Sequence, residues 1–265
     1  MNSTKKLRLA ASSYLNTAPL IWSFKYGARK DDVELSEALP SACAALLARH
    51  EVDFALVPAI EYQRIEDAEL MPGVCVGSRQ KVRSVVLVSR LNNLKKVRTV
   101  ALDDSSRTSA ALVRIIFKEF LQFEPEWITR SPDLKQMLRD SDAALIIGDP
   151  AMTFARDGLR VWDLAALWHD FTGLGFIFAM WMGRTANSGA TTIDFLQAAK
   201  EGLTTRNEII DHYEQRLGLS RSELEAYLTE NITFFLDDDL RKGLELYYEL
   251  AYKHELIPGL KPLNL

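Results

Sequence analysis

The sequence has few cysteines and histidines, the residues that bind zinc and iron–sulfur clusters in proteins. Among its 265 residues are two cysteines, Cys43 and Cys75, and four histidines, and none of these stand at the spacing of a zinc or iron–sulfur site. Both cysteines lie in apolar segments, where buried thiols are common. We therefore expect two buried thiols and no protein-bound metal.

Strong charge imbalance and long apolar runs are also absent. The 32 basic and 36 acidic residues give a net charge of −4, and no basic stripe alternates with aromatic residues, so nucleic acid is not expected as a partner. The best apolar run, Phe176 to Met182, is shorter than the roughly 18 residues of a membrane span. The basic N-terminus has no apolar stretch of a secretory signal before Ser12. We expect a cytoplasmic protein without a membrane partner.

Short β-type runs alternate with helical stretches over the first two thirds of the chain, which is typical of α/β folds. The first series predicts strands at Leu7–Ala11, Val33–Leu39, Phe54–Val57, Gly73–Gly77 and Val82–Ser89, with a helix over Ser41–Arg49. The second predicts strands at Thr99–Leu102, Glu126–Thr129 and Ala143–Ile147, with helices over Thr108–Phe120, Asp133–Arg139 and Pro150–Arg156. Ser131 and Asp149, each before a proline, are the expected N-caps of the last two helices.

Beyond Gly183 the pattern predicts helices alone. One covers Thr191 to Thr205, a capping box at Ser220–Glu223 begins another, and the acidic run Asp237–Asp239 is better explained by a helix start than by a cation site. These amphipathic helices must pack as a layer on the α/β part of the fold.

The simplest assembly is a two-lobed α/β fold whose hinge is made of two adjacent crossing strands, Val82–Ser89 and Phe176–Met182. The first lobe is then discontinuous, residues 1–91 and 183–265, and residues 92–182 form the inserted second lobe. A cleft between such lobes is the expected binding site. A single doubly wound sheet with a helical tail is the alternative.

Ligands of α/β sheets meet the loops that follow the carboxyl ends of strands. Four such loops carry polar or glycine residues, namely Ser12–Pro19, Val57–Tyr62, Asp103–Ser109 and Ile147–Ala151. The third brings hydroxyls and Arg107 to the start of a long helix, which suits a carboxylate or phosphate. Ordinary capping by Ser105 or Ser106 explains the same residues equally well. Trp168 and Phe176 are more often core than cleft residues.

Signature motifs of common enzyme classes are missing. The chain has no GxGxxG, no Walker pattern, no HExxH and no GxSxG, so nicotinamide-dependent, P-loop, zinc-protease and serine-hydrolase activities lose their main support.

Seven short motifs, in order, resemble a known family. They are Ser13–Leu20 (Ser-Tyr-Leu-Asn-Thr-Ala-Pro-Leu), Val57–Tyr62, Pro72–Cys75, Val82–Val85, Asp104–Ser109, Ile147–Asp149 and Thr172–Leu174. Together they are similar to the chorismate dehydratases of the futalosine route to menaquinone, from about residue 7 to residue 183 and more loosely beyond. The resemblance implies a type 2 periplasmic-binding-protein-like fold used as a lyase, with chorismate as the small-molecule substrate and no cofactor.

The resemblance also implies the site residues. Asn16 and Ser84 are the polar groups nearest the reacting ring. Ser106, Thr108 and Ser109 hold a carboxylate, and Arg107 either neutralises charge or points to solvent. The remaining binding residues are Ser13, Tyr14, Pro58, Ala59, Gly148 and Asp149.

Two alternatives share this fold. One is a solute-binding protein that captures a small carboxylate without chemistry. The other is the sister family of dihydroxynaphthoate synthases, which uses a catalytic histidine in the inserted lobe. The stretch Ala143–Gly148, where that histidine is expected, has none, which favours the dehydratase.

Overall fold

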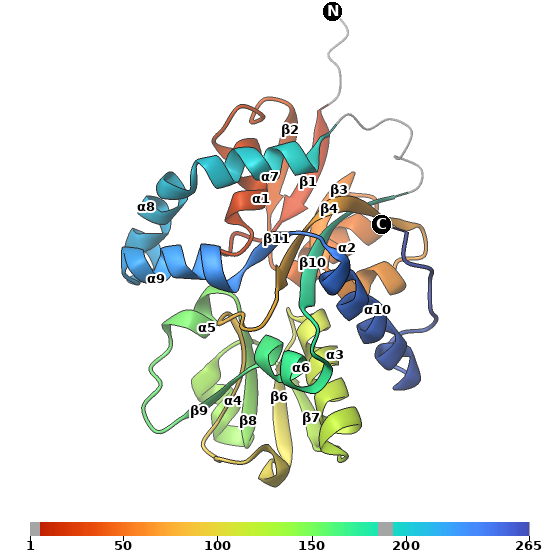
Figure 1. Ribbon diagram of the computed structural model, residues 1–265, viewed down its shortest axis with the longest axis vertical. Helices are drawn as coiled ribbons and strands as arrows, with labels where there is room; N and C mark the ends of the chain where they lie inside the picture. Colours follow the sequence, from red (N-terminus) through yellow and green to blue (C-terminus); the bar gives the residue numbers. More distant parts are fainter. Residues whose placement is uncertain (1–5, 185–192, 265) are drawn as a thin grey trace, which may run out of the picture.

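The apolar runs of the sequence form two separate β-sheets, each covered by helices (Figure 1). The computed structural model describes residues 6–184 and 193–264. Residues 1–5 lie outside this part, and with them most of the basic N-terminus on which the cytoplasmic location was predicted. Among the described residues no helix is long and apolar enough to cross a bilayer.

Sheet A contains the N-terminal strands. Within the described residues it has six strands in the order β11-β4-β10-β3-β1-β2. They are β1 (Leu7–Ala11), β2 (Val33–Glu37), β3 (Phe54–Pro58), β4 (Ala68–Ser78), β10 (Phe176–Arg184) and β11 (Thr233–Phe235). Strand β1 runs parallel to β2 and β3, and β10 runs antiparallel between β3 and β4.

Sheet B is formed by the middle of the chain. Its five strands in the described part have the order β7-β6-β8-β5-β9. They are β5 (Val85–Ser89), β6 (Thr99–Asp103), β7 (Glu126–Arg130), β8 (Ala143–Ile147) and β9 (Arg160–Asp163). Side chains alternate between the two faces of a strand. Val86 and Val88 accordingly pack in a small cluster with Met137 and Leu138, whereas Val85 and Leu87 join the main core.

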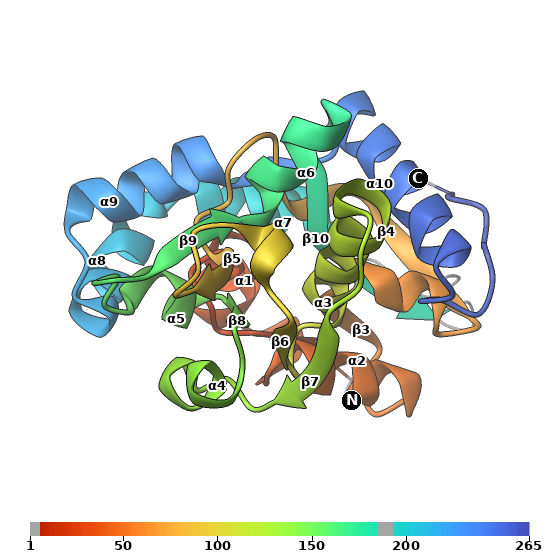
Figure 2. The same cartoon turned by 90° about the horizontal axis from the view of Figure 1, so that it is seen from below.

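Helices cover both sheets. The α-helices are α1 (Ala18–Lys25), α2 (Pro40–Ala48), α3 (Arg107–Ile115), α4 (Leu134–Asp140), α5 (Asp149–Thr153), α6 (Leu164–Thr172), α7 (Phe195–Thr204), α8 (Arg206–Leu217), α9 (Arg221–Ala226) and α10 (Asp238–Lys253). Short 3₁₀ turns are η1 (Ala59–Gln63) and η2 (Leu94–Lys96), and π-helical turns are η3 (Ile116–Leu121) and η5 (Tyr227–Asn231). Helix α10 packs on both β10 and α3, and so contacts elements of both lobes (Figures 1 and 2).

The predicted pair of adjacent crossing strands is wrong. Strand β5 pairs with β8 and β9 inside sheet B, and β10 pairs with β3 and β4 inside sheet A. Both runs are apolar enough to be buried on both faces, and each satisfies its backbone in the middle of a different sheet. The chain crosses between lobes in the segments just before them. The division of the chain at residues 92 and 182 stays a prediction. Strand β5, predicted for the first lobe, belongs to sheet B, and β10, most of which was predicted for the second lobe, belongs to sheet A.

Two helix starts also differ from the prediction. Asp133, not Ser131, caps α4 by accepting from the Gln136 N–H, and Gly148 is the N-cap of α5. The Asp149 carboxylate instead accepts from a distant amide, which explains why it does not cap its own helix.

The C-terminal region is close to the prediction. The capping box at Ser220 is confirmed, and so is a helix start at the acidic run Asp237–Asp239, where the Asp237 side chain also caps α10. Strand β11 contradicts the expectation of helices alone. Of the helix expected over residues 191–205, residues 191 and 192 lie outside the described residues, and α7 begins at Phe195 after the cap Asp194.

Candidate active site

The carboxyl ends of four strands, two from each sheet, meet at one cavity. Strands β1, β3, β6 and β8 end at Ala11, Pro58, Asp103 and Ile147. The segments after β1, β6 and β8 line the cavity, and β3 contributes its own last residue, Pro58. The cavity encloses about 510 Å³ of space not filled by atoms, a figure that includes its open mouth. Its lining residues are Ser12, Tyr14, Asn16, Thr17, Pro40, Leu56, Pro58, Val76, Val85, Ser106, Thr108, Ser109, Ile147, Gly148, Phe178 and Ala179.

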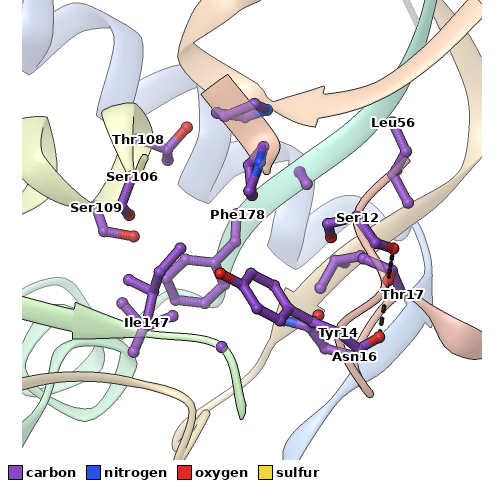
Figure 3. A pocket seen from close by; sticks show the side chains of 16 residues that line it. Ser12, Tyr14, Asn16, Thr17, Leu56, Ser106, Thr108, Ser109, Ile147 and Phe178 are labelled. Atoms are coloured by element: carbon purple, nitrogen blue, oxygen red, sulfur yellow. Dashed lines mark hydrogen bonds between the residues drawn. The ribbon is translucent and has the colours of Figure 1, made fainter. Parts of the chain in front are cut away.

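The cavity lining has no Asp, Glu, Lys, Arg or His, judged over the described residues. Its polar side-chain groups are hydroxyls and one amide, and its apolar wall comes mainly from β3, β4, β5, β8 and β10. Ser106, Thr108 and Ser109 lie on one side and Ser12, Asn16 and Thr17 on the other (Figure 3). Such a cavity can orient a small ring between two polar ends.

The loop after β1 is fixed from inside. The Thr17 hydroxyl reaches two backbone carbonyls, those of Ser12 at 2.6 Å and Tyr14 at 2.8 Å. From outside, helix α8 holds the Ser13 carbonyl, which accepts from the Tyr213 hydroxyl at 2.7 Å and from Arg216 at 3.1 Å. Ser13 therefore contributes its backbone to the loop and does not line the cavity.

Asn16 lies in this rigid loop with an unused acceptor. Its Oδ1 atom is buried and has no hydrogen-bond partner among the described residues. An unpaired buried carbonyl costs about 1–3 kcal/mol, which a bound ligand can recover by donating a hydrogen bond. This is the behaviour expected of a group that binds substrate.

The N-terminus of α3 is open to the cavity. Ser106 stands at the N-cap without making a side-chain cap, and the Ser105 hydroxyl donates to Asp103 at 2.6 Å. The capping explanation for these serines is therefore wrong. Uncapped amides and the helix dipole attract an anion, and the hydroxyls of Ser106, Thr108 and Ser109 are close by.

Gly148 and Tyr14 are in close contact. Gly148 has φ +67°, and a Cβ placed there would lie 2.8 Å from three atoms of the Tyr14 ring. Burial, and then the negative charges of Asp103 and Asp149, raise the pKa of Tyr14 to about 12. Tyr14 is thus a neutral hydroxyl at physiological pH, held against a position where only glycine fits.

Other predicted residues lie outside the cavity lining. Arg107 pairs with the buried Glu61 at 3.1 Å and lines a separate surface groove. The Ala59 carbonyl accepts from the Tyr248 hydroxyl. Ser84 is fully buried, and its Oγ accepts from the Tyr227 hydroxyl at 2.6 Å.

Asp149 joins the two lobes instead of facing the cavity. Its Oδ1 accepts from the Leu15 N–H at 2.9 Å, whereas its Oδ2 is buried and has no hydrogen-bond partner in the described part of the chain. Burial raises the pKa of Asp149 to about 6, against the lowering effects of the Leu15 amide and of Arg216.

Several lining residues were missed because they lie within strands. Leu56, Val76, Val85, Ile147, Phe178 and Ala179 look like ordinary core residues in the sequence. Ser12 and Thr17 lie in a predicted loop but were not selected, and Pro40 begins α2. Trp168 and Phe176 are core residues, and the Trp168 indole donates to Gly175. The aromatic wall comes from Phe178, two residues farther along β10.

Two α/β lobes with a cavity between them define a periplasmic-binding-protein-like fold. A protein from Archaeoglobus fulgidus superposes with a TM-score of 0.77 over 97% of this chain and 100% of its own, at 17% identity. The periplasmic aliphatic sulphonate binding protein of Escherichia coli superposes with a TM-score of 0.64 over 99% and 94%, at 18% identity. These likenesses show the fold.

The chain belongs to the menaquinone biosynthesis family, whose model matches residues 7–253. It is 30% identical to the chorismate dehydratase of Thermus thermophilus over 91% of this chain and 93% of that protein. It is 32% identical to the chorismate dehydratase of Campylobacter jejuni over 63% of this chain and 62% of that protein.

Proposed function

We propose that this protein is a chorismate dehydratase, a hydro-lyase that converts chorismate to 3-[(1-carboxyvinyl)oxy]benzoate in menaquinone biosynthesis. The observation that carries the proposal is an interlobe cavity with polar, uncharged groups at both ends and no charged side chain in its lining, judged over the described residues. The Thermus thermophilus protein, which this chain matches over 93% of that protein's length, bears the same name.

The reaction suits a site without a strong acid or base. The C3 hydrogen of chorismate is acidified through the conjugated ring carboxylate. Loss of this proton and of the C4 hydroxyl forms a benzene ring and releases one molecule of water, so aromatisation supplies much of the driving force. The protein has to orient the ring and stabilise the carboxylate charge that grows in the transition state.

The open N-terminus of α3 is the binding site for one carboxylate. Backbone amides of its first turn and the hydroxyls of Ser106, Thr108 and Ser109 supply hydrogen bonds without a formal charge. The apolar wall that includes Val85, Ile147 and Phe178 then packs against the ring.

Asn16 lies at the opposite polar end. An amide is too weak a base to take a proton from carbon, so its role is to hold the substrate and stabilise charge through the unpaired Oδ1 and the amide N–H groups. We assign proton removal to a carboxylate of the substrate itself. The cavity lining offers no ionisable group other than the Tyr14 phenol within the described residues, and with its raised pKa this phenol is a poor base at neutral pH.

Incubation of the purified protein with chorismate tests the proposal. Ultraviolet absorbance should change as the diene becomes a benzoate, and the product mass should fall by one water. A protein that binds chorismate in calorimetry but leaves it unchanged would be a solute-binding protein, and the proposal would fail.

A further inference from the structure

Tyr227 places a buried hydroxyl against Ser84. The two residues are distant in sequence, Tyr227 is 1% exposed and Ser84 is 0% exposed. The Tyr227 O–H donates to Ser84 Oγ at 2.6 Å. Burial raises the pKa of Tyr227 above its usual range, so the phenol keeps its proton at all working pH values.

The backbone of Ser84 is held in an unusual turn. Its N–H donates to the Val82 carbonyl at 2.7 Å, across Arg83 with φ +61°. A tight turn over a residue with positive φ is strained for any residue except glycine. The Asp163 carboxylate stabilises this turn by accepting from the amides of Val82 at 3.1 Å and Arg83 at 2.6 Å.

The same turn is tied to the cavity. The Ser84 carbonyl accepts from the N–H of Gly148 at 2.7 Å, and Gly148 and the next residue, Val85, both line the cavity. Backbone strain that is held in place by several surrounding hydrogen bonds is characteristic of functional positions. Ser84 therefore lies directly behind the lining, with its backbone fixed.

The hydroxyl of a serine has one proton and two acceptor sites. Tyr227 occupies one acceptor site of Ser84, which lies outside the cavity lining. The geometry points to Tyr227 as a positioning residue that holds Ser84, and through it the lining residues Val85 and Gly148, in the arrangement that the transition state needs. This inference rests on the proposed dehydratase function.

The position of Tyr227 is fixed by the helical turn in which it lies. Tyr227 opens the π-helical turn η5 (Tyr227–Asn231), a form that occurs frequently at functional sites. At the other end of this turn the Asn231 amide donates to the Lys81 carbonyl at 3.0 Å, in the segment that leads to Ser84. The C-terminal region is in this way attached to the crossing between the two lobes.

A double-mutant cycle tests the inference. Tyr227→Phe removes only the donor and should lower kcat for chorismate by about tenfold with little change in KM, because the wall that Val85 and Gly148 form loses support and the bound substrate loses its alignment for reaction. In a Ser84→Ala background the same change should have almost no effect on kcat. Tyr62→Phe is the matched control, since the buried Tyr62 also donates at 2.6 Å, to the carbonyl of Pro262, away from the cavity.

The outcomes separate the two proposals. Equal fold losses from Tyr227→Phe with and without Ser84 would overturn the positioning role, and so would equal losses from Tyr62→Phe. Should Tyr227→Phe fold poorly, Asn231→Ala tests the same coupling from the surface. It should lower kcat only when Ser84 is present, and a loss independent of Ser84 would also overturn the role. A wild-type protein that leaves chorismate unchanged overturns the dehydratase proposal itself.

Discussion

Asp149 gives a prediction that combines charge with contact between the lobes. Its Oδ1 accepts from the Leu15 N–H, and its Oδ2 is buried without a hydrogen-bond partner among the described residues. Arg216 approaches Oδ2 only to 3.8 Å and is 42% exposed, so it compensates the buried charge weakly. Replacing Asp149 by Asn keeps an acceptor for Leu15 and removes the charge. Replacing it by Ala removes both.

The magnitude follows from the pKa. Burial raises the pKa of Asp149 from 3.8 to about 6 in the folded protein, so the folded state holds this proton more tightly than the unfolded state does. The free energy of unfolding of the wild-type protein therefore falls, through Asp149, as the pH rises from about 4 to about 6, and this decrease stays constant at higher pH. At 1.36 kcal/mol for each tenfold change, it amounts to about 3 kcal/mol.

Urea unfolding of the three proteins between about pH 4 and pH 8 measures these effects. The free energy of unfolding of Asp149→Asn should equal that of wild type near pH 4 and exceed it by up to about 3 kcal/mol above pH 6. Asp149→Ala should be less stable than Asp149→Asn by about 1–3 kcal/mol at every pH, because the buried Leu15 amide loses its acceptor. A pH-independent difference between wild type and Asp149→Asn would refute the buried charge. Equal stability of the two variants would refute the interlobe hydrogen bond.

Three further predictions concern the cavity. Asn16→Ala should lower turnover of chorismate by roughly 10²-fold or more while the melting temperature changes little, because the unpaired amide oxygen contributes nothing to the folded state; near wild-type kcat would remove Asn16 from the site. Gly148→Ala should destabilise the protein more than Gly158→Ala, by roughly 1–3 kcal/mol in thermal unfolding, since both have positive φ but only the first added Cβ meets the Tyr14 ring; equal losses would contradict this contact. Turnover should survive exhaustive dialysis against a chelator, and loss of activity restored by one divalent metal would contradict the expected independence from metals.

Hydrophobic periodicity located most of the framework correctly. Strands β1 and β8 match the predicted Leu7–Ala11 and Ala143–Ile147, and the capping box at Ser220 is in place. These features depend on neighbours in sequence. The pairing of β5 and β10 does not, because a strand that is apolar on both faces fits the centre of either sheet. Only the tertiary structure decides which sheet it joins.

The site was predicted to the level of loops. Strand ends followed by polar residues selected the segments around Asn16, Thr108 and Gly148, and these three residues line the cavity. The direction of individual side chains was not predictable, because it depends on partners far away in the chain. Arg107 turns toward Glu61, which lies in the loop after β3 and comes close only when the lobes meet.

Two hydrogen bonds between the lobes predict that ligand binding and lobe closure are coupled. The Ile60 N–H donates to Thr108 Oγ1, and the Leu15 N–H donates to the Asp149 carboxylate. Each bond joins a loop of sheet A to a loop of sheet B, and each lies within one or two residues of the cavity lining. A ligand that contacts Asn16 on one side and Thr108 on the other must therefore favour the same arrangement that these bonds favour. We expect closure to exclude water from the cavity and to strengthen the hydrogen bonds of uncharged donors, so that a dianionic substrate is held without a charged side chain in the described lining.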